Sequence, residues 1–304
     1  LLKLYMPDDL RTHMTPHYRR LGAIAGDELD TLARLADLRD PVLHHRDAMG
    51  RDEDWVEFHP AYRQMEEIAF SDFGIHAMTH SAGVLDWPDP FPPLAKYAFQ
   101  YLFVQGEFGL MCPISVTDTS AHLIKSFAND AVKERFLPGM LTRDTNTMLK
   151  AAQFMTEKTG GSDVGANQVT ARHESGDVWR LSGDKWFCSC ADGDVAMVLA
   201  RPDGAPGGTR GLALFIMPRV LDDGSPNSYR IVRLKEKLGT RSMASGEIVL
   251  EDAVAYLVGD ADKGFKQMMA QVNLSRLSHG VRAAAMMRRC LNESLAVARG
   301  RRAF

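Results

Sequence analysis

The stretch FMTEKTGGSD at residues 154–163 gives the most specific information in this 304-residue chain. An apolar run leads into Thr156 and Glu157, and a turn with the adjacent glycines Gly160 and Gly161 follows. Adjacent glycines let the backbone approach a flat or anionic ligand closely and direct N–H groups at it. A Gly-Gly turn is also common in β domains that bind nothing, so this stretch by itself predicts only a strand and a turn.

Strand-like segments surround this stretch from residue 148 to about residue 259. Ser175-Gly176-Asp177 separates two short strand-like runs, which is typical of a hairpin. Continuous apolar runs at 195–200 and 212–217 are typical of strands buried on both faces. Two more strands are expected at 229–234 and 247–250. Residues 148–259 therefore predict a compact central β domain, either barrel-like or a sandwich.

Helical periodicity lies on both sides of the β segment. Residues 1–147 contain apolar residues at helical spacing, most clearly at 28–35, 62–70 and 94–108, and a short helix ended by Pro138. The spacing returns in residues 260–304 and predicts one long helix with an apolar stripe that includes Phe265, Met269, Met287 and Leu295. The expected fold class is α+β: a helical N-terminal domain, a central β domain, and the start of a C-terminal helical bundle.

Composition excludes few functions. Hydrophobic residues make up 45% and charged residues 25%, and the net charge of −3 gives no general attraction to nucleic acid or acidic membranes. No apolar run approaches the roughly 18 residues needed to span a bilayer. The first residues, LLKLY, are followed at once by Pro7, which is not typical of a secretory signal. We expect a cytoplasmic protein whose sequence begins inside a longer chain, because no initiator Met is present.

The four cysteines predict neither a metal site nor redox chemistry. Cys188 and Cys190 are two apart in a strand-like run and would share one sheet face. A zinc site needs a second ligand pair at a suitable spacing, and Cys112 and Cys290 do not supply one. Buried free thiols are therefore expected, and no metal is assigned.

A second informative stretch is GDKWFCS at residues 183–189. Phe187 and Ser189 would project from the same face of a strand. An aromatic face beside a hydroxyl suits an isoalloxazine ring, although a core aromatic with a hydrogen-bonded Ser is an equal alternative. The stretches KLGTR at 237–241 and RRAF at 301–304 say little alone.

Taken in this order, the four stretches resemble the acyl-CoA dehydrogenase family over nearly the whole chain. KERFLP at 133–138 is similar to the family's segment before its β domain. Met155-Thr156-Glu157 with the Gly-Gly-Ser-Asp turn, and VEFHPAY at 56–62, resemble the alkylation-response (AidB-type) branch. The resemblance implies an FAD cofactor and α,β-dehydrogenation of an acyl-CoA thioester, with an electron-acceptor flavoprotein as a partner.

The resemblance also implies roles for particular residues. The cofactor-binding set comprises Gln153, Met155, Thr156, Gly161, Ser162, Phe187, Ser189, Arg301 and Phe304. Thr156 would lie near the pyrimidine edge of the flavin, Phe187 replaces a family Trp, and Ser189 matches a family Thr. Ser162, between the cofactor phosphates and the acyl-CoA, and Arg276, near the CoA, would contact substrate. Arg301 and Phe304 would hold the cofactor of a neighbouring subunit, which implies a homo-oligomer, a dimer or a tetramer.

No catalytic base is assigned. In this family a carboxylate removes the α proton while the β hydrogen leaves as hydride. One branch carries the base on the long helix at the position of Ser275, and the commoner position would lie beyond Phe304. Glu157 is expected to be structural. Without the downstream part we expect the apolar stripe to cause association and the flavin to be retained poorly.

A second hypothesis comes from the basic end of the chain. Arg282, Arg288, Arg289, Arg299, Arg301 and Arg302 stand against one acidic residue, Glu293. A basic helix can contact nucleic-acid phosphates, and the AidB-type branch is associated with DNA binding. No groove-reading motif accompanies the charge, so a solvated helix face is the favoured interpretation. A flavin-containing DNA-binding protein with vestigial dehydrogenation remains the alternative function.

Overall fold

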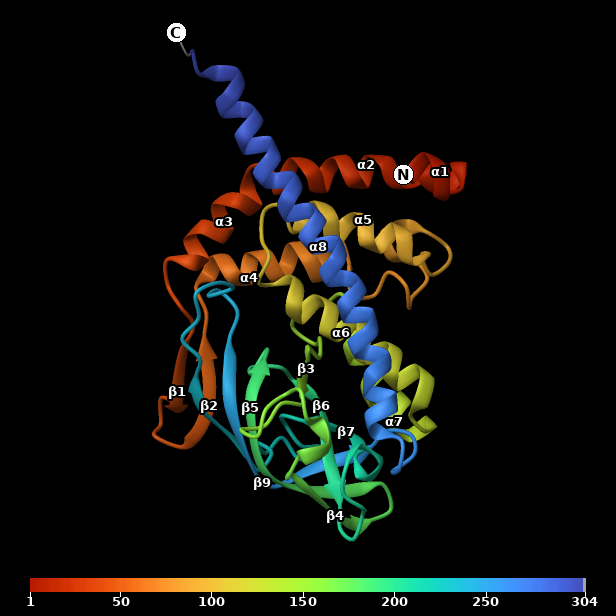
Figure 1. Cartoon of the computed structure of the whole chain (residues 1–304), viewed down its shortest axis with the longest axis vertical. Coiled ribbons are helices and arrows are strands. Elements are labelled where there is room, and N and C mark those ends of the chain that lie inside the picture. Colours follow the sequence, from red (N-terminus) through yellow and green to blue (C-terminus); the bar gives the residue numbers. More distant parts are fainter. Residues whose placement is uncertain (303–304) are drawn as a thin grey trace.

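The computed structural model describes residues 1–302, and its N-terminal half is mainly helical (Figure 1). The helices are α1 (Leu2–Tyr5), α2 (Asp8–Ala25), α3 (Glu28–Asp37), α4 (Pro60–Glu66), α5 (Pro93–Phe103), α6 (Met111–Phe127) and α7 (Asp130–Leu141). A π-helical turn, Glu67–Asp72, continues α4, and a short 3₁₀ turn spans Val84–Asp86. The α+β fold class predicted from the sequence is confirmed.

A β-hairpin interrupts the expected helical region. Strands β1 (Val42–Arg46) and β2 (Asp52–Glu57) pair antiparallel between α3 and α4. The Asp47 carboxylate closes the turn by accepting hydrogen bonds from the backbone N–H groups of Met49 and Arg51. The hairpin is largely exposed and therefore lacks the apolar alternation by which strands are recognised in a sequence.

Two helix ends also differ from the prediction. The helix expected at 94–108 ends at Phe103, before the Gly106 turn. The helix expected to end at Pro138 continues to Leu141. Proline in the last turn of a helix removes only one backbone donor, so α7 tolerates Pro138 near its end.

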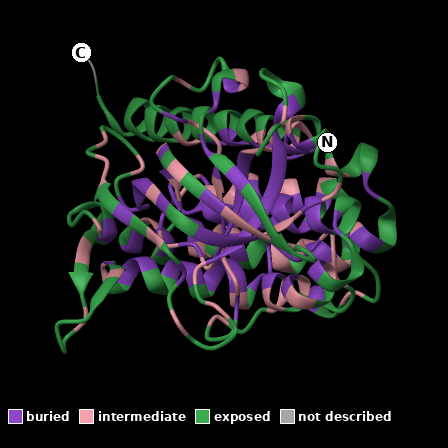
Figure 2. Ribbon diagram, turned by 90° about the horizontal axis from the view of Figure 1, so that it is seen from below, coloured by how far each residue is buried: buried purple, intermediate pink, exposed green. Residues whose placement is uncertain are grey.

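The central part is a seven-stranded, barrel-like sheet in the order β3-β5-β4-β6-β7-β9-β8, with β3–β6 and β5–β9 as additional pairings. Its strands are β3 (Ala151–Phe154), β4 (Thr170–Ser175), β5 (Val178–Ser189), β6 (Val195–Pro202), β7 (Ala213–Pro218), β8 (Tyr229–Leu234) and β9 (Ser245–Leu257). The expected hairpin is present: Ser175 pairs with Val178, and Gly176 adopts the φ of 51° that the turn requires. β7 is buried throughout and β6 up to its last two residues, as predicted. Figure 2 shows in purple that buried residues are concentrated in the interior of the molecule.

Helix α8 (Gly264–Gly300) begins on the sheet and crosses α6 and α5 (Figure 1). A Cβ atom at Gly264 would lie 2.3 Å from the backbone of Leu214, so only glycine permits this contact with β7. The predicted apolar stripe divides in two. Phe265 and Met269 are half-buried, whereas Met287 is 68% exposed on the distal half of the helix that projects from the molecule. The first half of the stripe therefore packs partly against the molecule, and the second half is exposed.

None of the helices within residues 1–302 combines the length and the apolar character that crossing a bilayer requires.

Candidate functional site

The structure places two of the predicted stretches side by side. Gln153 of β3 pairs with Ser189 of β5, and the Trp186 N–H donates to the Thr156 carbonyl at 2.8 Å, which continues the same register. Directly paired residues project from the same face of a sheet. Thr156 lies three residues from Gln153 along the chain, so it is separated from Ser189 by about 10 Å, a span suited to a fused ring system.

The face beside this pairing combines an exposed aromatic ring with hydroxyl groups. Phe187 is 47% exposed although it belongs to a strand, and Lys235 Nζ lies 5.5 Å from its ring centroid. Within residues 1–302 the hydroxyls of Thr156 and Ser162 have no hydrogen-bond partner. A flat apolar surface flanked by free hydroxyls fits the faces and the polar edge of an isoalloxazine ring. We call Gln153, Met155, Thr156, Phe187 and Ser189 the β3–β5 row.

A buried ion pair fixes the Thr-Glu segment. Glu157 accepts hydrogen bonds from the backbone N–H groups of Gln168 (2.6 Å) and Val169 (3.2 Å) and from Lys185 Nζ (2.8 Å). Lys185 also donates to the Leu199 carbonyl at 2.8 Å. Burial lowers the pKa of Lys185, and Glu157 offsets that effect only in part. The carboxylate therefore anchors the turn, in keeping with the expected structural role.

The two glycines of the turn have different tasks. Gly160 adopts a φ of 111°, which a side chain would strain. A Cβ atom at Gly161 would lie 3.0 Å from Thr156 Oγ1 and would cover that hydroxyl. Ser162 follows directly and is exposed. The turn thus leaves the Thr156 hydroxyl and Ser162, at one end of the β3–β5 row, accessible to a ligand.

Helix α8 contacts the β3–β5 row near the start of the helix, and its later residues lie away from the row. Gln153 Nε2 lies 2.9 Å from Met268 Sδ. Arg276 is exposed and its guanidinium donates to Asn273 Oδ1 at 3.4 Å. Arg301, just after the end of α8, is roughly 50 Å from Met268 along the helix axis. Arg301 and Gln153 of one chain therefore cannot touch the same ligand, and Phe304 lies outside the described residues.

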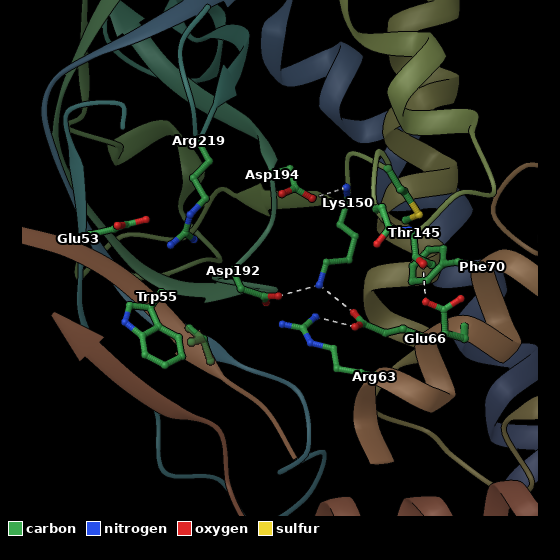
Figure 3. A pocket seen from close by; sticks show the side chains of 14 residues that line it. Glu53, Trp55, Arg63, Glu66, Phe70, Thr145, Lys150, Asp192, Asp194 and Arg219 are labelled. Carbon is green, nitrogen blue, oxygen red and sulfur yellow. Dashed lines mark hydrogen bonds and ion pairs between the residues drawn. The ribbon is translucent and has the colours of Figure 1, made fainter. Parts of the chain in front are cut away.

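A separate polar cleft of about 570 Å³ contains none of the predicted site residues (Figure 3). It lies between β2, α4 and the loop after β5. Lys150 Nζ bridges Glu66 (2.8 Å) and Asp192 (2.7 Å), and Arg63 pairs with Glu66 at 2.6 Å. Burial alone would lower the pKa of Lys150, but the two carboxylates raise it above its usual value. These four charged side chains balance one another and join α4 to the sheet. Apart from the neighbours Arg63 and Glu66, they are far apart in the sequence and form no motif, so this cleft could not be predicted from the sequence.

Profiles of three protein domains match the chain in succession. The adaptive response protein AidB N-terminal domain matches residues 3–146, the acyl-CoA dehydrogenase middle domain matches residues 152–253, and the acyl-CoA dehydrogenase C-terminal domain matches residues 262–304. The chain belongs to the acyl-CoA dehydrogenase family. The AidB-type resemblance is confirmed as well, because the putative acyl-CoA dehydrogenase AidB of Escherichia coli is 32% identical over 93% of the chain.

Other relatives agree. Acyl-CoA dehydrogenase family member 11 of Caenorhabditis elegans is 30% identical over 96% of the chain. The chain spans about half the length of these curated relatives, 48% and 52%. Among solved structures, Bd2924 in its apo form superposes with a TM-score of 0.90 at 32% identity, covering 100% of this chain and 60% of that one. C. elegans ACDH-11 in complex with C11-CoA gives 0.86 at 29% identity, covering 95% and 49%.

Proposed function

We propose that this chain carries the flavin-binding part of an FAD-dependent acyl-CoA dehydrogenase that oxidises an acyl-CoA thioester to its α,β-unsaturated product. The β3–β5 row carries this proposal, because an exposed aromatic and free hydroxyls lie together on two strands that the sequence separates by some thirty residues. The complex of the C. elegans relative with C11-CoA supports an acyl-CoA as the ligand class.

The residues of the row would bind and orient. Phe187 and Met155 would cover the flat faces of the ring, while the Thr156 and Ser189 hydroxyls would hydrogen-bond its polar edge. FAD, when bound, would accept the hydride from the β carbon. Ser162, at the open end of the turn, and the exposed Arg276 would hold the phosphates of the cofactor and the CoA. Among residues 1–302 we assign no base for the α proton, and half-buried Ser275 has no group that could serve.

The position of Arg301 favours a homo-oligomer. Since it cannot reach the row of its own chain, Arg301 would contact the cofactor of a second copy, where its planar guanidinium suits a pyrophosphate. An electron-acceptor flavoprotein as partner and a cytoplasmic location stay predictions.

The test is anaerobic bleaching of the bound flavin by a panel of acyl-CoAs. Phe187→Ala and Ser189→Ala should each weaken FAD retention about tenfold or more, because each removes one contact of the ring. Phe127→Ala removes a comparably exposed phenyl from the end of α6 and should leave FAD retention unchanged. Failure of every chain length to bleach the flavin would refute the dehydrogenase.

The alternative, a DNA-binding flavoprotein, retains some support from the end of α8. Arg288, Arg299, Arg301 and Arg302 are exposed. The structure removes the other two arginines from the predicted basic face: Arg289 pairs with Asp30 (3.0 Å) and Glu293 (2.8 Å), and Arg282 is buried. DNA affinity that falls steeply with salt and is lost in Arg299→Ala with Arg302→Ala would favour this function over the first.

A further inference from the structure

Three cationic side chains are buried in the described part of the chain, and they differ in how their charge is balanced. Lys96 Nζ lies 2.6 Å from the Asp118 carboxylate, and Lys185 Nζ lies 2.8 Å from that of Glu157. Arg282 is only 1% exposed, yet no carboxylate within residues 1–302 lies within 4.0 Å of it. A buried charge without a counter-charge is costly, and charged side chains are almost never fully buried unless they are paired.

The hydrogen bonds of Arg282 leave part of its guanidinium free. Nε donates to Ser278 Oγ at 3.1 Å, and Nη2 donates to the Met111 carbonyl at 3.0 Å and to Ser115 Oγ at 2.5 Å. Nη1 makes no hydrogen bond to any residue that the structure describes. Neutral oxygens satisfy donors but do not balance the charge, so burial lowers the pKa of Arg282.

A second cation without a carboxylate partner lies nearby. Lys237 is half-buried and its Nζ donates to the Met243 carbonyl at 2.6 Å and to Ser245 Oγ at 3.2 Å. Ser245 pairs directly with Ser189 across β5 and β9. Lys237 therefore lies one strand away from the β3–β5 row.

The chain around the start of α6, which includes Cys112, contacts both Arg282 and the loop that follows Lys237. Arg282 donates to the carbonyl of Met111 at 3.0 Å, and a Cβ atom at Gly109 would lie 2.9 Å from Ser242 Oγ in that loop. The charges of Arg282 and Lys237 both act to lower the pKa of Cys112. Burial has the larger effect and raises the pKa of Cys112, so the thiol stays neutral at neutral pH and is no counter-ion. Besides Cys112, the charged group that acts on Lys237 is Asp40, and this exposed carboxylate is already bound by Arg241 at 2.8 Å.

We propose that Arg282 and Lys237 form an anion site beside the β3–β5 row that binds a carboxylate at the far end of the acyl group, so that the preferred substrates are thioesters of dicarboxylic acids. This inference rests on the proposed function. A carboxylate can accept a hydrogen bond from the free Nη1 of Arg282 and supplies the missing negative charge. An acyl chain with an apolar end would leave both cations unbalanced. The CoA phosphates are not competitors, because they would bind at the exposed end with Ser162 and Arg276.

The test compares equilibrium binding, by calorimetry on the FAD-loaded protein, of dicarboxylic acyl-CoAs and monocarboxylic acyl-CoAs of equal chain length. We expect the dicarboxylic thioester to bind at least about tenfold more tightly at its best chain length. Lys237→Met should reduce that ratio to about threefold or less, and Arg282→Met should abolish it. Lys263→Met removes an exposed lysine that pairs only with Asp260, and should leave the ratio unchanged.

Because the Arg282 side chain is fully buried, Arg282→Met could unfold the protein. In that case the affinity ratio measured for Lys237→Met, at a half-buried position, tests the inference by itself. Equal affinity for the two thioester classes would overturn the inference and leave the proposed function standing. A preference that stays at about tenfold in Lys237→Met would also overturn it. If no thioester of either class binds, the inference and the proposed function fall together.

Discussion

The Lys185–Glu157 pair gives the sharpest test of how the Thr-Glu turn is held. Lys185→Met keeps the length of the side chain but removes the charge that Glu157 faces at 2.8 Å and the donor to the Leu199 carbonyl. Breaking a buried pair by removing one partner typically costs about 3–5 kcal/mol. Glu157 keeps two backbone donors, from Gln168 and Val169, so we expect the low end, about 3 kcal/mol.

The assay is urea unfolding of four proteins: wild type, Lys185→Met, Glu157→Gln and the double variant. In the double variant the amide oxygen can still accept one of the two backbone hydrogen bonds, which reach different oxygens of Glu157, and no unpaired charge remains. Its cost should therefore be about 2 kcal/mol less than the sum of the single costs. Lys158→Met is the control, because this neighbouring lysine forms exposed contacts, a pair with Asp184 at 3.4 Å and a position 5.5 Å from the centroid of the Trp186 ring, and should matter by less than about 1 kcal/mol.

Two results would refute this account. A cost below about 1 kcal/mol for Lys185→Met would mean that the pair does not hold the turn. Strict additivity in the double variant would mean that the two side chains act independently despite their contact.

Further predictions concern pH and helix packing. Burial lowers the pKa of His76 to about 4, so between pH 6.5 and 4 the unfolded chain binds a proton that the folded protein does not. The free energy of unfolding should therefore fall by about 3 kcal/mol as the pH drops across that window. In acid unfolding, His76→Gln should make the stability less dependent on pH. Burial acts to raise the pKa of Asp118, but the hydrogen bond from His80 and the charge of Lys96 outweigh this effect and lower the pKa below its usual value. The ionised carboxylate therefore stabilises the fold above a pH of about 4, and this contribution should be lost as the pH falls further. Comparing the pH dependence of unfolding with that of Asp118→Asn measures it. Gly264→Ala should cost more than about 2 kcal/mol in urea unfolding because its Cβ meets the β7 backbone, whereas Gly280→Ala, with open space on the same helix, should stabilise by about 0.5–1 kcal/mol.

Local sequence patterns predicted most strands of the sheet and the shared strand face of Phe187 and Ser189. The runs at 195–200 and 212–217 are apolar throughout because both faces are covered, and they are too short for a typical helix, so their length indicates strands. The spacing of Phe187 and Ser189 placed them on one strand face, and the pairing with Gln153 agrees. Strands and turns depend on residues that are close together in the sequence, so short stretches are enough to predict them.

Contacts between distant elements could not be predicted in the same way. The β1–β2 hairpin depends on side-chain bonds from Asp47 rather than on apolar alternation, and it lies in a region whose neighbours are helical. The partners of the basic residues were equally hidden: Arg289 meets Asp30 from the first helices, and Arg282 turns into the interface with α6. A charge looks the same in a sequence whether it is solvated or buried, so the expected basic face included two residues that the fold removes from it.

The long helix links these parts physically. Gly264 fixes the start of α8 on β7 by backbone contact, so every later residue has a set height along the helix. Met268 then meets Gln153 of the row, and Arg282, roughly 20 Å further along the axis, meets the start of α6. Both lie on the buried face of one helix, because fourteen residues are close to four helical turns. A bulky residue at 264 would therefore shift the contact at Gln153 and the position of the buried guanidinium together, although neither touches Gly264. If α8 moves as a rigid helix, one substitution at Gly264 should therefore change both the contact with Gln153 and the position of Arg282. If α8 instead adapts locally to each part of the protein, the two should not change together.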